Sequence, residues 1–177
     1  MFTGIIEEVG VIREILTNLD GLEIEIDASL VLSDLKVNDS ISCSGICLTV
    51  TMLEKKSFKV QLVQETLKKT NAKNWVPGYS INLERALLPT SRMGGHIVQG
   101  HIDTVVKIKD MTFDDKSAVW RFELKKDIKR YLVKKGSICL DGISLTIADK
   151  TETDFSVALI PHTLEVTSWS NKKINDT

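Results

Sequence analysis

The sequence predicts an all-β protein that consists of two small antiparallel barrels built from short strands. The first observation behind this prediction is an internal repeat, since the second half of the chain repeats the residue pattern of the first. The second is a succession of short segments rich in β-branched residues and joined by brief connections, at six per copy. Closing such strands into a barrel removes exposed strand edges, so a barrel is favoured over an open sheet.

The repeat is visible when Ser40–Thr70 is aligned with Ser137–Thr167 without a gap. The offset follows from the glycines at 45 and 142, because 142 − 45 = 97. Identical pairs run along the whole span: Ser40/Ser137, Ile41/Ile138, Gly45/Gly142, Ile46/Ile143, Leu48/Leu145, Thr49/Thr146, Phe58/Phe155, Val60/Val157, Leu62/Leu159, Thr66/Thr163, Leu67/Leu164 and Thr70/Thr167. The first strands also match, as in Gly4/Gly100, with an offset one shorter. A repeat decides the fold, so we expect one barrel in residues 1–90 and a second in residues 91–177.

The composition is that of an ordinary soluble globular protein. Of the 177 residues, 42% are hydrophobic and 27% are charged, and the net charge of −1 gives no attraction for nucleic acid. The apolar runs are too short to span a bilayer and the N-terminus has no secretory pattern, so we expect a cytoplasmic protein. Three cysteines without metal-ligand spacing predict neither a disulfide framework nor a metal site. No cofactor motif is present either.

The first copy opens with a loosely alternating segment, Phe2–Arg13, which we expect to form its first strand. After a polar turn, apolar residues at 22, 24 and 26 alternate with acidic ones, which is the period-2 pattern of a half-buried strand. The remaining strands are expected at Ser40–Ser44, Cys47–Leu53, Ser57–Val63 and Ser80–Ala86. Helical turns are expected at Ala28–Leu35 and Glu65–Asn74, and Pro77-Gly78 marks a turn before the last strand.

The second copy repeats this order of elements. Strands are expected at Ile102–Lys109, Ala118–Leu124, Asp127–Val133, Ser137–Asp141, Ser144–Lys150 and Phe155–Ile160, with a helical segment at Thr163–Thr167. Most of the counterpart of Tyr79–Ala86 would fall beyond Thr177. We therefore expect the second barrel to lack its last strand in this chain.

The stretch Gly94–Asp103 joins the two copies and carries two of the three histidines. The paired glycines at its start permit a turn or a close backbone approach. A lone histidine is usually structural, so a turn or packing role is favoured for His96. His101 is favoured as a proton-transfer or ligand-contacting residue, because an imidazole with a reference pKa of about 6.5 exchanges protons near neutral pH.

Seven short motifs are spread over nearly the whole chain. They are Met1–Ile5, Gly45–Val50, Glu65–Leu67, Asn82–Ala86, Gly94–His101, Asp141–Thr146 and Ile160–Glu165. In their order, spacing and duplication, these motifs resemble the riboflavin synthase family, a lumazine-binding double-barrel family. The resemblance implies two tandem six-stranded antiparallel Greek-key barrels, of which the second lacks its last strand and the family's C-terminal helix in this chain.

The same resemblance implies a cofactor-free dismutation, in which one 6,7-dimethyl-8-ribityllumazine gives a four-carbon unit to a second. The products are riboflavin and 5-amino-6-(D-ribitylamino)uracil. The family is typically a homotrimer, with each active site between the N-terminal barrel of one subunit and the C-terminal barrel of its neighbour. We therefore expect a transferase of riboflavin biosynthesis whose partners are two lumazine molecules.

The resemblance also implies the residues of the site. The expected catalytic residues are His101, Cys47, Ser40 and Ser144. The expected substrate-binding residues are Phe2, Gly4, Ile5, Ile6, Cys47, Leu48, Thr49, Gln61, Leu62, Val63, Gln64, Glu65, Thr66, Gly100, His101, Ile102, Lys135, Ser144, Leu145, Thr146, Leu159, Ile160, Pro161, His162, Thr163 and Leu164. Ser44 departs from the family, which commonly has asparagine before the glycine, but both side chains can hydrogen-bond.

Two copies of one fold can bind two copies of one ligand, but a dismutation requires the two ligand molecules to act differently. The copies differ accordingly, since Cys47 aligns with Ser144. Ionisable residues of the second copy that align with neutral ones are His101 (with Ile5), Asp141 (with Ser44) and Lys135 (with Asn38). Cys47 is open to three roles, as a nucleophile, a hydrogen-bond partner or a buried small residue. The alternative functions are a non-catalytic lumazine- or flavin-binding protein of the same fold, and a barrel that only mediates subunit contacts.

Overall fold

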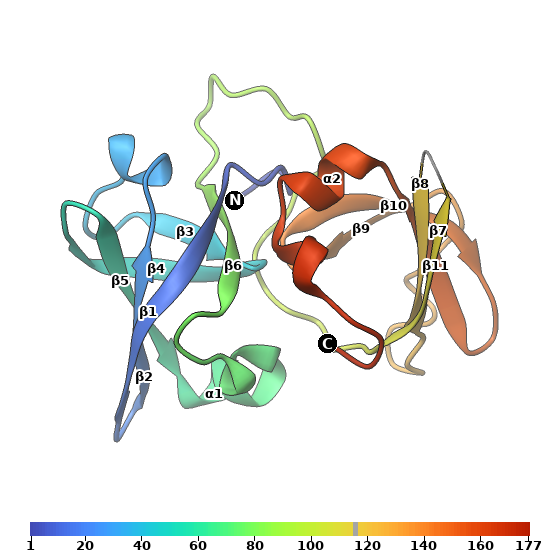
Figure 1. The fold of residues 1–177 in the computed structure, drawn as a ribbon, viewed down its shortest axis with the longest axis horizontal. Coiled ribbons are helices and arrows are strands. Elements are labelled where there is room, and N and C mark those ends of the chain that lie inside the picture. Colours follow the sequence, from blue (N-terminus) through green and yellow to red (C-terminus); the bar gives the residue numbers. More distant parts are fainter. Residues whose placement is uncertain (115–116) are drawn as a thin grey trace.

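The computed structural model describes residues 1–114 and 117–177, which form two β-sheet units side by side (Figure 1). In the first unit, the strands form a closed barrel in the order β1-β2-β5-β4-β3-β6. They are β1 (Glu8–Asn18), β2 (Gly21–Asp27), β3 (Ser40–Cys43), β4 (Ile46–Leu53), β5 (Ser57–Val63) and β6 (Ser80–Arg85). The antiparallel hairpins β3-β4-β5 with β2 returning beside β5 make the Greek-key arrangement. We call this unit the first barrel.

Short helical segments cover the ends of the first barrel, close to where the sequence predicts them. They are η1 (Val31–Ser33), α1 (Gln64–Lys69) and η2 (Asn71–Asn74). The Thr70 hydroxyl caps η2 by accepting a hydrogen bond from the backbone N–H of Ala72 at 3.2 Å. None of the helices in the described residues is long and apolar enough to cross a membrane.

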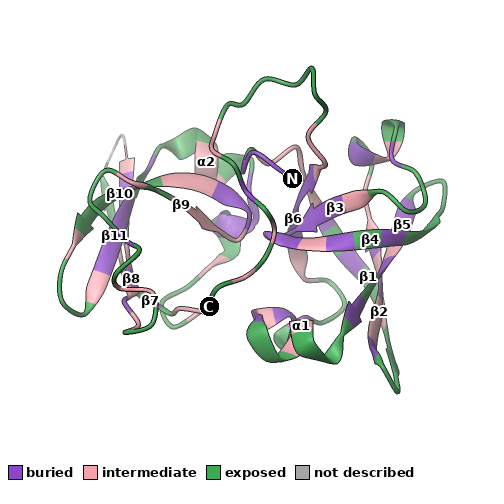
Figure 2. Cartoon of the chain, turned by 180° about the vertical axis from the view of Figure 1, so that it is seen from behind, coloured by how far each residue is buried: buried purple, intermediate pink, exposed green. Residues whose placement is uncertain are grey.

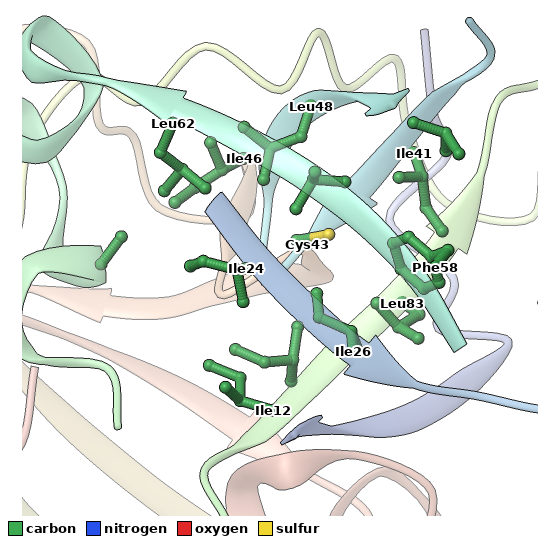
Figure 3. Packing of buried hydrophobic residues seen from close by; sticks show 14 of the residues in the cluster. Ile12, Ile24, Ile26, Ile41, Cys43, Ile46, Leu48, Phe58, Leu62 and Leu83 are labelled. Carbon is green, nitrogen blue, oxygen red and sulfur yellow. The ribbon is translucent and has the colours of Figure 1, made fainter. Parts of the chain in front are cut away.

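The core of the first barrel lies inside its closed wall. Every second residue of a strand points inward, so β2 contributes Ile24 and Ile26 while their acidic neighbours face outward. These side chains meet Phe58 of β5 and Leu83 of β6 (Figure 3). Burial of each large apolar side chain contributes about 1.5–3 kcal/mol, so this core accounts for the closure of the barrel.

The second unit, which we call the second sheet, has five strands within the described residues, in the order β7-β8-β11-β10-β9. They are β7 (Ile108–Asp114), β8 (Ser117–Glu123), β9 (Ser137–Leu140), β10 (Ile143–Lys150) and β11 (Asp154–Leu159), followed by α2 (Pro161–Glu165) and η3 (Ser168–Asn171). In the first barrel β6 pairs with both β1 and β3, and this closing strand has no counterpart in the second sheet as described. The predicted double-barrel fold with an incomplete second barrel is therefore confirmed.

The second core is rich in aromatic side chains. Trp169 of η3 stacks on Trp120 of β8 with ring centroids 4.8 Å apart, and Phe122 stacks on Phe155 at 5.4 Å. The η3 segment thus covers apolar side chains on the inner face of the second sheet. Buried residues concentrate on the strands of both units, whereas the long loop between β6 and β7 is exposed at its tip (Figure 2).

The predicted strand at Asp127–Val133 is wrong, because this segment forms consecutive turns. Two of its carbonyl groups bond to a lysine side chain instead of to a neighbouring strand. The Lys150 ammonium donates to the carbonyl oxygens of Lys129 and Leu132, both at 2.7 Å. The apolar Ile128 and Leu132 still pack on the second core, which explains the strand-like composition. With the offset of 97, the segment aligns with the η1 region of the first copy.

The first strand of each copy begins later than predicted. β1 begins at Glu8 instead of Phe2, and β7 begins at Ile108 instead of Ile102. Among the residues before each strand, Gly4 and Gly100 bond to the other unit, whereas Glu7 and Lys107, which directly precede the strands, bond to their own sheet.

Candidate functional site

Two extended segments cross where the two units meet. We call residues 1–6 strap one and residues 96–102 strap two. Phe2 and Val98 exchange backbone hydrogen bonds at 2.8 and 3.0 Å, and the His96 N–H donates to the Thr3 carbonyl oxygen at 3.0 Å. The side chains of Phe2 and Val98 are buried at this crossing. The two straps therefore form a short antiparallel pair that links the units.

Each strap docks on the unit of the other copy. The Ser144 N–H of β10 donates to the Gly4 carbonyl oxygen at 2.7 Å, and the Cys47 N–H of β4 donates to the Gly100 carbonyl oxygen at 2.9 Å. Both glycines have a left-handed backbone, with φ of +77° and +80°. A Cβ at Gly4 would lie 2.7 Å from the Ser144 Cβ, and one at Gly100 would lie 2.5 Å from the Cys47 Cβ. Only glycine allows this approach.

Site one lies on the outer face of the first barrel. Along β4 the side chains of Cys47 and Thr49 point outward, and along β5 those of Gln61 and Val63 do so. Ser40 of β3 pairs in register with Thr49, so three neighbouring strands present polar groups on one surface. We define site one as these five residues with the strap-two residues Gly100, His101 and Ile102 beside them.

Site two is the equivalent surface of the second sheet. Ser144 and Thr146 project from β10, and Ser137 of β9 pairs in register with Thr146. Ala158 and Ile160 are exposed at the end of β11. We define site two as these five residues with the strap-one residues Gly4, Ile5 and Ile6. Ala158 was not among the predicted residues, although the repeat offset aligns it with Gln61.

Predicted site residues that lie at the ends of β5 and β11 begin the following helices. They are Gln64, Glu65 and Thr66 of α1, and Pro161, His162, Thr163 and Leu164 of α2. The structure thus places a helix start next to each site.

Several predicted binding residues turn their side chains away from either surface. The side chains of Leu48, Leu62 and Leu159 are buried in the barrel cores, and that of Leu145 packs on the second core. At these positions only backbone atoms face outward. Lys135 lies in the turn before β9 with an exposed side chain, and its φ of +68° matches the +75° of Asn38 in the first copy.

His96 contacts a predicted catalytic residue. Its Nδ1 lies 2.7 Å from the Ser144 Oγ, at site two. Burial lowers the pKa of the His96 imidazole below its ordinary value, which favours the neutral ring that can accept a hydroxyl proton. The sequence favoured a turn or packing role for His96, because a lone histidine is usually structural. The contact with Ser144 was not predicted, because it joins residues 48 positions apart. His101 is exposed, and its ring makes no hydrogen bond within the described residues.

A serine pairs with a cysteine across neighbouring strands in both copies, but the strand that carries the serine in one copy carries the cysteine in the other. Ser42 of β3 pairs with Cys47 of β4, whereas Cys139 of β9 pairs with Ser144 of β10. Burial raises the pKa of the Cys139 thiol to about 12, so this residue is a neutral thiol at physiological pH. A hydroxyl and a thiol thus occupy paired positions in both copies in opposite order, with Ser42 itself buried.

Asp141 serves the contact between the units. Its Oδ2 accepts hydrogen bonds from Trp169 Nε1 at 3.1 Å and from Lys172 Nζ at 3.0 Å. Burial opposes the charge of Lys172, but the Asp141 carboxylate and Tyr79 outweigh it and leave the pKa of Lys172 raised. Asn82 of β6 also donates to the Asp141 carbonyl oxygen at 2.9 Å. The carboxylate that distinguishes the second copy is thus engaged in structural contacts.

A cavity of about 710 Å³ lies between strap two and the open side of the second sheet. Its wall includes apolar side chains of the second core, such as Phe122, Ile138 and Trp169, and the strap residues around His101. Cys47, Thr49, Ser144 and Thr146 do not line it. This cavity is therefore the uncovered interior of the second sheet, and it borders the two sites only at their edges, through Gly100, His101 and Ile102 of site one and Ser137 of site two.

The two sites adjoin helices that lie on different sides of the molecule. Site one adjoins α1 and site two adjoins α2, and these helices lie at the bottom and the top of the view, on either side of the junction (Figure 1). The reverse view preserves this arrangement (Figure 2).

Comparison with known proteins agrees with the repeat. The sequence model of the family described as "Lumazine binding domain" matches residues 3–86 and again residues 99–177. Each match contains one β-sheet unit.

Curated relatives match nearly the whole chain. The chain is 42% identical over 174 residues to riboflavin synthase of Actinobacillus pleuropneumoniae, and the match covers 98% of this chain and 81% of that protein. The identity is also 42%, over 176 residues, to riboflavin synthase of Bacillus subtilis (strain 168), with the same coverage of 98% and 81%. For riboflavin synthase of Saccharomyces cerevisiae it is 40% over 188 residues, covering 99% of this chain and 79% of that protein.

Solved structures of similar shape include LumP in complex with 6,7-dimethyl-8-(1'-D-ribityl) lumazine. The TM-score is 0.90 at 19% identity, and the match covers 99% of this chain and 96% of LumP. LumP in complex with riboflavin matches with a TM-score of 0.91, also at 19% identity and with the same coverage of 99% and 96%. This likeness establishes the double-barrel fold.

Proposed function

Because the chain belongs to the riboflavin synthase family, we propose that it is a transferase that converts two molecules of 6,7-dimethyl-8-ribityllumazine into riboflavin and 5-amino-6-(D-ribitylamino)uracil. One lumazine gives up a four-carbon unit and becomes the pyrimidinedione. The other accepts the unit and becomes riboflavin. The observation that carries this proposal is the duplicated site, in which each copy of the repeat contributes a strap glycine to the other unit.

Holding two reactants in the correct geometry is the larger part of the proposed catalysis. Positioning alone can lower a barrier by up to roughly 7–11 kcal/mol. The two sites offer matching surfaces for two identical molecules, since the Ser40–Thr49 pair of site one recurs as Ser137–Thr146 in site two. The reaction is proposed to need no cofactor, because both reacting units come from the substrate.

Acid–base groups supply the smaller part. The reaction begins with loss of a proton from a ring methyl group of one lumazine. In site two, the neutral His96 ring can accept the proton of the Ser144 hydroxyl to which it is hydrogen-bonded. In site one, His101 is the adjacent imidazole, and it follows the glycine that contacts Cys47. The two lumazines thus meet different proton-transfer groups, as a dismutation requires.

The proposed assembly follows from the directions of the two sites. Two lumazines must touch to exchange carbon atoms, but the sites adjoin helices on different sides of one chain (Figure 1). We therefore propose that site one of one subunit faces site two of its neighbour, in a homotrimer. The chain is proposed to act in the cytoplasm.

The direct test is to mix the purified protein with 6,7-dimethyl-8-ribityllumazine. Riboflavin should appear by its fluorescence, together with an equal amount of the pyrimidinedione by chromatography. A protein that bound the lumazine without forming either product would be the non-catalytic binding protein instead. A protein that neither bound nor converted it would leave only a role in subunit contacts.

His101→Gln is expected to slow turnover by about 100-fold while lumazine binding stays near that of the parent, since a general acid–base group is typically worth 100- to 10,000-fold. Cys47→Ser should do much less harm, because Ser144 occupies the matching position of site two. Single-turnover rates and lumazine titrations of both variants check this prediction. Parent-like turnover of His101→Gln would remove His101 from the proton-transfer role.

His96→Gln is expected to slow turnover by about tenfold and to change its pH dependence. Burial lowers the pKa of His96, so the neutral ring predominates above that pKa and is lost as the pH falls through it. The parent should therefore lose activity on the acid side, below pH 6.5, in step with the His96 ring signals in NMR spectra. His96→Gln should lack this step. A step that persisted unchanged in the variant would have to be assigned to another group.

A further inference from the structure

Glu84 is a buried carboxylate in β6, and its hydrogen bonds all come from strap one. Its Oε1 accepts from the Thr3 N–H at 2.6 Å and from the Thr3 hydroxyl at 2.7 Å. Its Oε2 accepts from the Gly4 N–H at 2.9 Å. Within the described residues, the ion pairs of the chain do not involve Glu84, and burial raises its pKa. A buried carboxylate without a cation is costly unless hydrogen bonds stabilise it, so strap one is its principal support.

The same two strap residues hold the polar groups of site two. The Thr3 carbonyl oxygen accepts from the His96 N–H at 3.0 Å, and the Gly4 carbonyl oxygen accepts from the Ser144 N–H at 2.7 Å. The His96 ring and the Ser144 hydroxyl then meet at 2.7 Å. Glu84 therefore accepts hydrogen bonds from the N–H groups of Thr3 and Gly4. The carbonyl oxygens of these same two residues hold the backbones of His96 and Ser144.

We propose that Glu84 is a positioning residue for site two, which sets the His96–Ser144 pair by anchoring Thr3 and Gly4 of strap one. Its effect on turnover rests on the proposed function, whereas its effect on the geometry of strap one does not. Glu84 does not act on site one, because the Cys47 N–H bonds to Gly100 of strap two.

The three groups that bond to Glu84 require a carboxylate. The Thr3 N–H, the Thr3 hydroxyl and the Gly4 N–H all donate, and an ionised carboxylate offers acceptor oxygens only. Glu84→Gln keeps one oxygen, which can still accept from Thr3, but its NH₂ group faces the Gly4 N–H. Glu84→Ala removes every acceptor. The loss of anchoring should therefore be graded, with alanine more severe than glutamine.

Amide hydrogen exchange on the ligand-free protein tests the proposal, because the repeat supplies an internal reference. The exchange rate of the Ser144 N–H reports its contact with Gly4 of strap one, and that of the Cys47 N–H reports the equivalent contact with Gly100 of strap two. In Glu84→Ala, exchange at Ser144 should accelerate by about tenfold or more relative to Cys47. Glu84→Gln should give a smaller change of the same sign. A general loss of stability would accelerate both amides alike and leave the ratio unchanged.

Asp154→Ala provides the matched control. Asp154 accepts from Arg121 at 2.7 Å and from the Thr153 hydroxyl at 3.2 Å, at the opposite end of β11 from Ile160. This variant should leave the Ser144-to-Cys47 ratio at the parent value. If Glu84→Ala does not fold, Thr3→Val carries the test, since it keeps the Thr3 N–H bond to Glu84 and removes the hydroxyl bond at 2.7 Å, together with the longer bond of 3.3 Å that the hydroxyl accepts from the Ile5 N–H. It should shift the ratio in the same direction.

A ratio that stays at the parent value in the folded Glu84 and Thr3 variants would overturn the proposal. Turnover is measured on the same samples, and Glu84→Ala is expected to lose about tenfold at saturating lumazine, with partial recovery in Glu84→Gln. If the ratio shifts but the parent forms no riboflavin, the proposed function fails and the positioning role stands. If the parent forms riboflavin and the ratio does not shift, the positioning role fails alone.

Discussion

Gly100→Val is expected to abolish riboflavin formation by destroying site one. At a φ of +80°, any L-residue costs about 1–2 kcal/mol, and a β-branched one costs more. The new Cβ would lie 2.5 Å from the Cys47 Cβ and 2.9 Å from the Cys47 backbone nitrogen. Because β4 is held on both sides within a closed barrel, the end of strap two at Gly100–Ile102 must move instead, away from His96 at its other end. A displacement of 1 Å at a reacting centre costs about 100-fold, and loss of the strap contact moves His101 as well.

The matched control for this variant is Gly78→Val. Gly78 has a similar left-handed backbone, with a φ of +87°, but no atom lies within 4 Å of the added Cβ. It should therefore lose a comparable amount of stability and keep its turnover. Thermal unfolding and single-turnover rates of both variants measure this difference. Equal turnover in Gly78→Val and Gly100→Val would mean that the strap contact is not part of the active site.

Gly4→Val is expected to be equally inactive, because it destroys site two. Gly4 has a φ of +77°, and the added Cβ would lie 2.7 Å from the Ser144 Cβ and 2.8 Å from its backbone nitrogen. Strap one would have to leave β10, which breaks the bond from the Ser144 N–H to the Gly4 carbonyl oxygen and separates Ser144 from His96. Complete loss of product formation is the expected result, with site one intact.

NMR titration with 6,7-dimethyl-8-ribityllumazine distinguishes the two variants. In Gly4→Val, the amide signals of Cys47 and Gly100 should still shift on addition of the lumazine, whereas that of Ser144 should not. Gly100→Val should show the reverse. Simultaneous loss of both responses in either variant would show that the two surfaces are not independent sites.

The repeat made the first barrel predictable from the sequence. Strands such as β2 and β5 alternate apolar and polar residues because one side faces the core, and this local pattern is readable without a structure. The family resemblance also implied Gly4, Gly100, Cys47 and Ser144 as site residues, and the repeat aligns them in pairs.

The exchange of the straps could not be predicted, because the decisive contacts join distant residues. The sequence predicts a strand of the second barrel from Ile102 onward. Strap two, which ends at this residue, lies instead on the first barrel, where the Gly100 carbonyl oxygen accepts from the Cys47 N–H. His96 reaches Ser144 at this crossing, and Glu84 meets Thr3 although 81 positions separate them in the sequence. Periodicity describes which face of a segment is buried, but it does not say against which unit.

If two lumazine sites from different subunits make one catalytic centre, as we propose, a mixture of the two inactive variants should be active. Gly100→Val keeps site two and Gly4→Val keeps site one, so co-expressed or jointly refolded subunits contain intact pairs of sites. The mixture is expected to form riboflavin although neither variant does so alone. A mixture that assembles into oligomers containing both variants and stays inactive would contradict it.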